Sequence, residues 1–387
     1  MRKERMGLGF GLNLLLLLAM VATNLLSFYH LLSISTTSPT TPSDHPSPPV
    51  PDHLLRQLST IRATINHLTR LHPLSPPSTT TSPSSKSPPS DLLLHSLLLP
   101  IATACHDHPD LLHRFMNYTP FSPCPSLPPS LPESLILRGC HPLPRPRCFS
   151  RTPPSSPPSL PSDPFPSTLP DSSVLWSSYD SSSSSCKSFS CLNPSLGFDM
   201  RSESYRFLKS SDLDLSVPQF LKIAAGLSSP IRLGLDVGGG TGTFAAQMKR
   251  LGNATVVSTT MNLGAPYSEA VAVRGLVPLH VPLQQRFPVA DGTMDLVRCG
   301  HAVNRWIPVP ALEFLMYDAD RLLRGGGFLW IDHFFCKGGD LEKVYAPMIG
   351  RLGYKKLKWA SANKTDASGL KNGDVYLTAL LQKPALK

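Results

Sequence analysis

A glycine-rich turn lies within IRLGLDVGGGTGTFAAQM, residues 231–248. An apolar run ends in Asp236 and a helical pattern begins at Thr243; between them stand Gly238, Gly239, Gly240, Thr241 and Gly242. Glycine lets a backbone turn sharply and lie directly against a ligand, and the free N–H groups that open a helix attract a carboxylate or phosphate. The pattern therefore predicts a small-molecule site built from a strand, a glycine turn and a helix.

Three classes of ligand use turns of this kind: mononucleotide phosphates, dinucleotides and S-adenosylmethionine. A phosphate loop needs lysine and then Ser or Thr after the last glycine, where this chain has Thr243 and Phe244. Residues 240–245 do satisfy the nicotinamide fingerprint G-x-G-x-x-[GA]. That fingerprint also needs an acid about 20 residues later, and VVSTTMN at 256–262 has none. It asks for no acid before the glycines, so Asp236 favours S-adenosylmethionine over a nicotinamide-dependent oxidoreductase.

Strand and helix signals alternate after residue 195, where the composition becomes that of a globular domain. A helix is predicted to begin at the capping residue Ser216, and another covers PALEFLMYDADRLL until Gly325–Gly327 end it. The apolar runs predict strands near 231–237, 254–260, 277–283, 294–300, 327–335, 354–361 and 374–382. This alternation predicts an α/β fold with a doubly wound, mostly parallel sheet, whose last two strands form an antiparallel hairpin at the edge.

Candidate catalytic residues follow the fourth strand and lie in the fifth. Ligands of open α/β sheets gather at the carboxyl ends of the strands, which brings forward His301, Asn304, Arg305, Asp332 and His333. His301 is a candidate general base, and Arg305 could clamp an acidic group; the alternative for each is a structural role. Adjacent residues of a strand point to opposite faces, so at most one of Asp332 and His333 is expected to reach the site.

Several segments together resemble a known family. LDVGGGTGTFA resembles motif I of the class I S-adenosylmethionine-dependent methyltransferases, FPVADGTMDLVRCGHAVNRW resembles their fourth-strand region, and DADRLLRGGGFLWIDHF resembles the helix and strand that follow. With the basic N-terminus, the apolar stretch, the Pro-rich stem, LRGCHPLPRPRC and SCKSFSCLN, the chain is similar to plant Golgi-type methyltransferases, distant kin of the pectin methyltransferase-like proteins. The resemblance implies a Rossmann-like seven-stranded sheet and S-adenosylmethionine as the cofactor.

The resemblance also implies roles for residues at matching positions. Asp236 and the loop from Gly238 to Gly242 would face the methionine and ribose parts of the cofactor. Thr260, Met261 and Asn262 stand where the family usually places an acid that grips the ribose hydroxyls. Asn262 can hydrogen-bond a hydroxyl, but more weakly than a carboxylate does. An acid is also absent after the third strand, where Gln284 or Gln285 could substitute.

Methyl transfer to oxygen, with a cell-wall polysaccharide or uronic acid as acceptor, is the activity that the resemblance implies. A carboxylate acceptor needs no base, whereas a sugar hydroxyl needs one within hydrogen-bond reach. The alternative is a non-catalytic binding or scaffold module that keeps the fold. The missing ribose acid favours that alternative, and the intact glycine loop argues against it.

The N-terminus predicts a membrane anchor. MRKER is basic, and residues 6–32 contain no Asp, Glu, Lys or Arg, a length that crosses a bilayer. Positive charge before the stretch and none just after it predict a cytosolic tail at 1–7, a signal anchor at 8–32 and a lumenal remainder. We therefore expect a single-pass type II protein of the Golgi or another secretory-pathway membrane; a cleaved signal peptide is the alternative.

The remaining boundaries follow from composition. Of 387 residues 42 are proline, which argues for one main domain. We expect a Pro/Ser/Thr-rich stem at 33–90, a Cys-containing segment at 91–150, a linker at 151–172, a Cys pair with a lead-in helix at 173–230 and the methyltransferase domain at 231–387. The formal charge of +10 is compatible with an acidic substrate, but scattered basic residues and the lack of a recognisable module argue against nucleic acid.

Cysteine usage supports an oxidising compartment. Six clustered cysteines predict a disulfide framework of open connectivity: Cys105, Cys124, Cys140, Cys148, Cys186 and Cys191. Cys299 and Cys336 lie in predicted strands and are expected to be buried thiols. No metal site is predicted, because CHDHPDLLH at 105–113 lacks a second Cys/His pair at ligand spacing. Asn117, Asn253 and Asn363 begin glycosylation sequons.

Overall fold

The computed structural model describes residues 91–385 except 94, 96–100, 128–129, 154–160, 180–185 and 365–372. The predicted cytosolic tail at 1–7, the signal anchor at 8–32 and the stem at 33–90 lie outside the described residues. Within the described part of the chain, no helix combines the length and apolar character needed to cross a bilayer.

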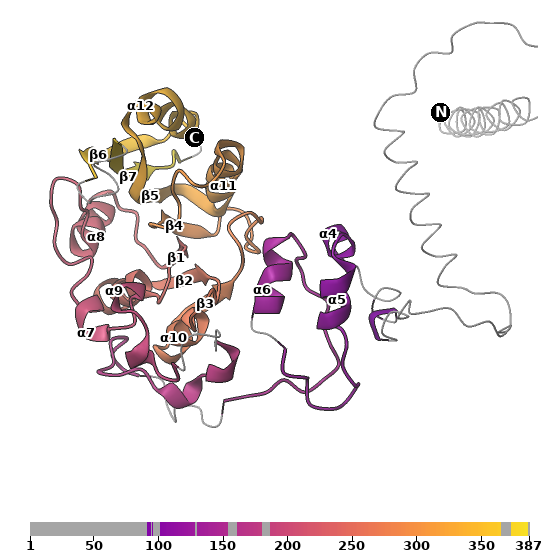
Figure 1. Ribbon diagram of the computed structural model, residues 1–387. Coiled ribbons are helices and arrows are strands. Elements are labelled where there is room, and N and C mark those ends of the chain that lie inside the picture. Colours follow the sequence, from indigo (N-terminus) through magenta and orange to yellow (C-terminus); the bar gives the residue numbers. More distant parts are fainter. Residues whose placement is uncertain are drawn as a thin grey trace, which may run out of the picture. The chain divides into compact units, whose positions relative to one another are not determined.

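A seven-stranded mixed sheet forms the centre of the domain, in the order β3-β2-β1-β4-β5-β7-β6 (Figure 1). Strands β1 to β5 are parallel, and β7 pairs antiparallel with both β5 and β6. The predicted edge hairpin is confirmed, with β6 outermost. The strands are β1 Leu233–Val237, β2 Thr255–Thr260, β3 Val277–His280, β4 Met294–Cys299, β5 Leu323–Lys337, β6 Lys355–Asn363 and β7 Asp374–Gln382.

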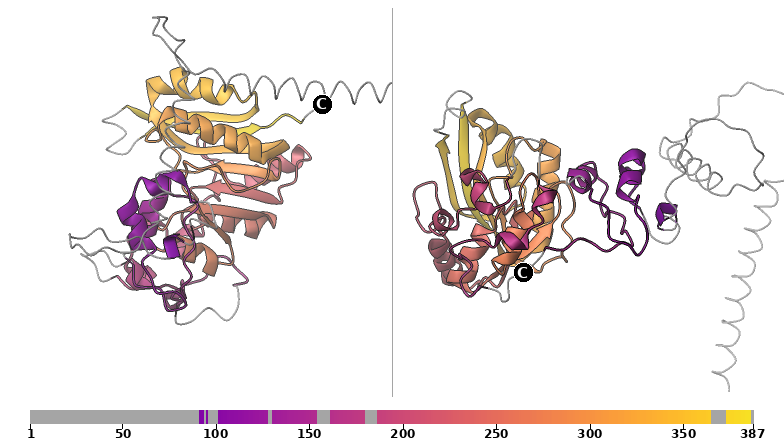
Figure 2. Two further views of the ribbon diagram at one scale, coloured as in Figure 1. Left: turned by 90° about the vertical axis from the view of Figure 1, so that its right-hand side faces the viewer. Right: turned by 60° about the horizontal axis from the view of Figure 1, so that its bottom comes forward.

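Helices cover both faces of the sheet (Figure 2). On one face the residues of α11 pack on Leu235, Val297 and Leu329; on the other, α8 and α9 pack on Leu296 and Phe328. Neighbouring strand residues thus serve opposite faces, as the period of two requires. The helices of this domain are α8 Val217–Gly226, α9 Thr243–Gly252, α10 Tyr267–Val273, α11 Val309–Leu322, α12 Gly338–Asp340, the π-helical η5 Leu341–Tyr345 and α13 Ala346–Gly350.

The ends of two helices test the sequence predictions. The predicted cap of α8 is confirmed, because the Ser216 side chain accepts a hydrogen bond from the Gln219 N–H. The prediction that Gly325–Gly327 end α11 is wrong: the helix ends at Leu322 and the glycines lie within β5. Lys383 explains the difference, since its Nζ caps the Asp320 and Leu323 carbonyls while its backbone pairs with Gly326 and Gly327.

The segment before the sheet carries short helices and disulfides. The predicted framework is confirmed in the described residues, with the pairs Cys105–Cys140, Cys124–Cys148 and Cys186–Cys191. The predicted buried thiols of Cys299 and Cys336 are also confirmed. The helical elements here are α4 Thr103–His106, α5 Pro109–Phe115, α6 Ser130–Leu137, η1 Asp171–Ser173, η2 Trp176–Ser178, η3 Phe189–Cys191, η4 Pro194–Leu196 and α7 Met200–Glu203.

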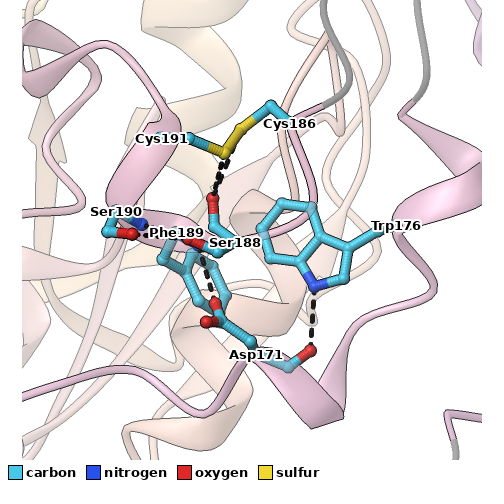
Figure 3. The surroundings of a disulfide bond; sticks show 7 residues. All are labelled: Asp171, Trp176, Cys186, Ser188, Phe189, Ser190 and Cys191. Atoms are coloured by element: carbon cyan, nitrogen blue, oxygen red, sulfur yellow. Dashed lines mark hydrogen bonds between the residues drawn. A yellow bond between two sulfur atoms is a disulfide. The ribbon is translucent and has the colours of Figure 1, made fainter.

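Residues 161–179 and 186–214, which we call the strap, pack against the sheet domain. The apolar side chains of Leu169, Phe189 and Phe198 form a buried cluster with α10. Asp171 fixes the turn beside the Cys186–Cys191 disulfide: its side chain accepts from the Phe189 N–H at 2.7 Å, and its carbonyl accepts from the Trp176 indole at 2.9 Å (Figure 3). The strap is therefore held against α10 by an apolar cluster that is separate from the two clusters on the faces of the sheet.

The aromatic contact between α8 and β5 provides a test of the fold. The Phe220 ring lies 5.2 Å from that of Trp330 and 5.5 Å from that of Phe328, and all three side chains are buried. We expect Phe220→Ala to lower the free energy of unfolding by about 3–5 kcal/mol, measured by chemical denaturation. Phe314→Ala is the matched control, because Phe314 is 78% exposed and should cost less than about 0.5 kcal/mol. Equal losses in the two variants would contradict this packing.

Candidate functional site

The glycine loop between β1 and α9 takes a sharp turn with left-handed backbone at Gly238, Gly240 and Gly242. Gly238 has φ 71° and Gly240 has φ 56°. A Cβ at Gly238 would lie 2.4 Å from the Ala302 Cβ, so this glycine permits close contact with the loop after β4. A Cβ at Gly240 would meet nothing within 4 Å. Gly238 therefore serves packing, while Gly240 faces open space.

A buried charge network joins the carboxyl ends of β1 and β4 to the middle of β5. Arg298 donates from Nη1 to Asp236 at 2.6 Å and from Nη2 to Asp332 at 2.5 Å. Its guanidinium packs against the rings of Phe207 and Phe244, 4.7 and 4.6 Å from their centroids. The second carboxylate oxygen of Asp236, Oδ2, is buried and has no hydrogen-bond partner among the described residues. One polar atom at the glycine loop is thus available for a ligand.

Burial and ion pairing shift the pKa values of this network in opposite directions. Burial raises the pKa of Asp236 despite the attraction of Arg298. Burial alone would also raise the pKa of Asp332, but the charge of Arg298 and the hydrogen bond from His333 outweigh it and hold the pKa at about 2. Burial opposes the charge on Arg298, yet its two carboxylate partners raise its pKa. Asp332 and Arg298 are therefore a fixed ion pair.

Asp332 and His333 line the same cavity, so the prediction that at most one of them reaches the site is wrong. The pairing of β5 with β7 shifts register between Ile331 and Phe334, and His333 has φ 52°. This irregularity cancels the usual alternation of side chains. His333 Nδ1 lies 2.8 Å from Asp332 Oδ1, and Nε2 lies 3.1 Å from Asp214 Oδ1. The hydrogen bond to Asp332 raises the pKa of His333.

Three cavities lie along these strand ends. The β2 cavity, about 480 Å³, is lined by Gly238, Gly240, Thr260, Met261, Tyr267 and Gln284, among others. The glycine-loop cavity, about 120 Å³, is lined by Asp236, Gly240, Glu203 and Arg206, among others. The β5 cavity, about 460 Å³, is lined by Lys209, Asp332, His333 and Tyr376, among others. The first two share Leu196, Gly238 and Gly240, and the last two share Arg206, Phe207, Arg298 and His301.

Most predicted cofactor residues lie around the first two cavities. Asp236, Gly238, Gly239, Gly240 and Thr241 line the glycine-loop cavity, and Thr260 and Met261 line the β2 cavity. Gly242 instead caps α9, and a Cβ there would press on Val271 and Leu276.

Asn262 is held elsewhere. Its amide nitrogen donates to Tyr179 at 2.8 Å and to Glu269 at 2.9 Å, and its oxygen accepts from the Ser268 N–H. It is not among the residues that line the β2 cavity, whereas Gln284 is. Hydrogen bonds with the strap and α10 thus engage the Asn262 side chain, which the sequence analysis had considered as a partner for a ribose hydroxyl.

The predicted catalytic residues do not all lie at the same cavity. His301 lines both the glycine-loop and β5 cavities, and burial lowers its pKa, so the imidazole is neutral at neutral pH. Asp332 lines the β5 cavity but is committed to Arg298. Arg305 lines none of the three cavities; its guanidinium pairs with Asp374 at 3.3 Å and stacks on Trp306.

Sequence reasoning missed the contribution of the strap. Leu196, Glu203, Arg206 and Phe207 line the glycine-loop cavity, and Tyr205, Lys209 and Asp214 line the β5 cavity. These residues precede the strand and helix pattern of the domain, so periodicity could not reveal them. The one signal available was YRFLK at 205–209, where aromatic and basic residues alternate.

The fold and the glycine loop define a class of protein. A seven-stranded sheet with this strand order, a reversed β7 and a glycine loop after β1 is the class I, Rossmann-like methyltransferase fold. Residues 235–331 match a family described as a methyltransferase domain.

A full-length relative then identifies the family. A protein of Arabidopsis thaliana described as a probable methyltransferase is 60% identical over 395 residues, which cover 98% of this chain and all of that protein. The chain belongs to this methyltransferase family, and it is an S-adenosylmethionine-dependent methyltransferase.

Solved structures show more distant likeness. A geranyl diphosphate C-methyltransferase from Streptomyces coelicolor, in complex with Mg²⁺, geranyl diphosphate and S-adenosyl-L-homocysteine, is 11% identical with a TM-score of 0.33, covering 43% of this chain and 77% of that one. An N-methyltransferase from Bradyrhizobium japonicum is 14% identical with a TM-score of 0.32, covering 43% and 93%.

The open space at Gly240 leads to a prediction. Gly240→Val places a side chain in both the β2 and glycine-loop cavities, and we expect it to abolish the heat of binding of S-adenosylhomocysteine in calorimetric titration. Gly292→Val is the matched control, because Gly292 has φ 65°, also faces open space and lines none of the three cavities. The backbone strain is similar in the two variants. Normal affinity in Gly240→Val would show that the loop is only a tight turn.

Proposed function

We propose that this protein is a membrane-anchored, lumenal methyltransferase that moves a methyl group from S-adenosylmethionine to a carboxylate oxygen of an acidic sugar, such as a uronic acid of a cell-wall polysaccharide. The observation that carries the proposal is the β5 cavity. It is lined by basic and aromatic side chains, and it shares Arg298 and His301 with the glycine-loop cavity. A donor and an acidic acceptor can therefore meet there.

The residues of the first two cavities fit the cofactor. The β2 cavity has the volume for the adenosine part, with Met261 and Tyr267 as apolar walls. The smaller glycine-loop cavity suits the amino-acid end. Two observations support this placement: the buried Asp236 Oδ2 has no partner among the described residues, and Gly240 leaves the room that a Cβ would fill.

The β5 cavity fits an anion that carries a ring. Lys209 supplies positive charge, while the carboxylates of Asp332 and Asp214 are already engaged by Arg298 and His333. Tyr205 and Tyr376 supply aromatic surface, on which an apolar face of a sugar can pack. The side chains around this cavity therefore favour an acidic sugar over a neutral one.

The chemistry places few demands on this site. Bound S-adenosylmethionine supplies an activated methyl group, and the protein's part is to hold an acceptor oxygen in line with it and to exclude water. A carboxylate is already deprotonated at neutral pH and needs no base. His301 is the one neutral imidazole at the junction of the cavities, so it would be the base if the acceptor were a hydroxyl.

The compartment is part of the proposal. The charge-free stretch of residues 6–32 after a basic N-terminus supports a type II signal anchor in the Golgi or another secretory-pathway membrane. The disulfides Cys105–Cys140, Cys124–Cys148 and Cys186–Cys191 support an oxidising lumen for the described part of the chain. The sequence resemblance to plant Golgi-type methyltransferases agrees with both.

Methyl transfer from labelled S-adenosylmethionine tests the acceptor. We expect label in de-esterified oligogalacturonides, and none in the same oligomers whose carboxyl groups are already methyl esters. Neutral xylan serves as the control for hydroxyl acceptors. Label in xylan, or equal label in the esterified and de-esterified oligomers, would contradict a carboxylate acceptor.

His301→Gln separates the two kinds of oxygen. With a carboxylate acceptor the variant needs no base, so we expect kcat to fall by less than about tenfold. With a hydroxyl acceptor the loss of a general base would lower kcat by about 10²–10⁴-fold. The measurement is kcat with saturating oligogalacturonide, and a fall of the larger size would overturn the proposed carboxylate chemistry.

A further inference from the structure

The strap forms one wall of the glycine-loop cavity. Leu196, Gly197, Glu203, Arg206 and Phe207 all line it, opposite the glycines. These residues precede the stretch 235–331 that matches the methyltransferase-domain family. The cavity is therefore built from two parts of the chain, of which only one belongs to the recognised domain.

Hydrogen bonds fix this wall on the first turns of α9. The Thr243 hydroxyl donates to Glu203, and the Gln247 amide donates to the Ser204 and Arg206 carbonyls at 2.9 and 3.0 Å. Glu203 and Gln247 are buried. The carboxylate of Glu203 is thus held beside the glycine loop, in a position that α9 itself determines.

Arg274 ties the other end of the strap to the same loop. Its guanidinium is fully buried and donates from Nε to the Pro164 carbonyl and from Nη1 to the Thr241 carbonyl, each at 2.7 Å. The ring of Phe165 lies between the guanidinium groups of Arg274 and Arg250, at 4.8 and 4.6 Å. Displacement of the strap would therefore disturb the glycine loop directly.

Two arginines line the cavity, and they differ in what they can still bind. Arg298 is buried and uses both Nη atoms on Asp236 and Asp332. Arg206 contacts Glu203 through Nη1, at 3.1 and 3.2 Å, and its side chain is 58% exposed. Only the Glu203–Arg206 pair therefore presents both an accessible cation and a carboxylate in the cavity. A zwitterion aligned antiparallel to such a pair satisfies both charges.

We propose that Glu203 and Arg206 bind the amino-acid end of the methyl donor, with Glu203 accepting hydrogen bonds from its ammonium group and Arg206 donating to its carboxylate. This inference rests on the proposed placement of the donor in the β2 and glycine-loop cavities. The strap is then part of the cofactor site. Its Glu203 and Arg206 supply charged contacts to the ligand in a chain that lacks the usual ribose acid. The adenosine part is held by other residues.

Glu203→Gln tests the inference in the full-length protein. Glutamine keeps an oxygen that accepts from Thr243, so the strap stays in place while the charge is lost. We expect the Kd of S-adenosylhomocysteine to rise by about 10- to 100-fold, the effect of losing a hydrogen bond between charged groups. The Kd of 5′-methylthioadenosine, which lacks the amino-acid end, should stay unchanged. Both are measured by calorimetric titration.

A neighbouring variant and the two ligands make the outcomes distinct. Arg201→Gln, on α7 with an exposed side chain, should bind both ligands as the wild type does. Unchanged binding of S-adenosylhomocysteine by Glu203→Gln, or an equal loss with both ligands, would overturn the role of Glu203. If the wild-type protein bound S-adenosylhomocysteine no more tightly than 5′-methylthioadenosine, the proposed placement of the donor would fail as well.

Discussion

The buried guanidinium of Arg298 holds the functional end of this sheet together. Asp236, near the end of β1, and Asp332, within β5, lie on either side of β4, and without a cation between them two carboxylates would be buried side by side. Removing one partner from a buried ionic network typically costs about 3–5 kcal/mol, because the remaining charges are left uncompensated. The guanidinium contacts the rings of Phe207 and Phe244, which also touch each other, so the strap and α9 both pack against it.

This constraint brings two cavities together. Arg298 and Phe207 line both the glycine-loop cavity and the β5 cavity, so the two cavities share side chains. Because Asp332 is fixed on Arg298, it can orient His333, which joins it to Asp214 of the strap. Residues that line the glycine-loop cavity and the β5 cavity are thus members of a single connected network.

Much of the domain was predictable from the sequence because its signals are local. The apolar runs located all seven strands, and the glycine turn located the loop, because strand burial and left-handed turns each leave a pattern in a few consecutive residues. The end of α11 was not predictable, since Lys383 arrives from the far end of the chain to cap it. The shared direction of Asp332 and His333 depends on a bulge against β7, which periodicity alone does not show.

The candidate site was predictable only in part, for the same reason. The cofactor loop lies within one stretch of the sequence. The hydrogen bond of Asn262 to Tyr179, and the cavity wall formed by Glu203 and Arg206, instead depend on contacts between residues distant in sequence. The sequence does contain a signal for Arg298, because a charged residue within the apolar strand LVRC needs a partner. Asp236 and Asp332, both in strands, were available to meet that need.

A crystal structure of the full-length protein with S-adenosylhomocysteine tests most directly whether the cavities around Arg298 join donor and acceptor. The account predicts adenosine against Met261 and Gln284, the amino-acid end between Gly240 and Glu203, and the sulfur beside His301, facing the cavity of His333 and Tyr376. A ligand whose sulfur faced away from the β5 cavity, or which left the glycine-loop cavity empty, would contradict it.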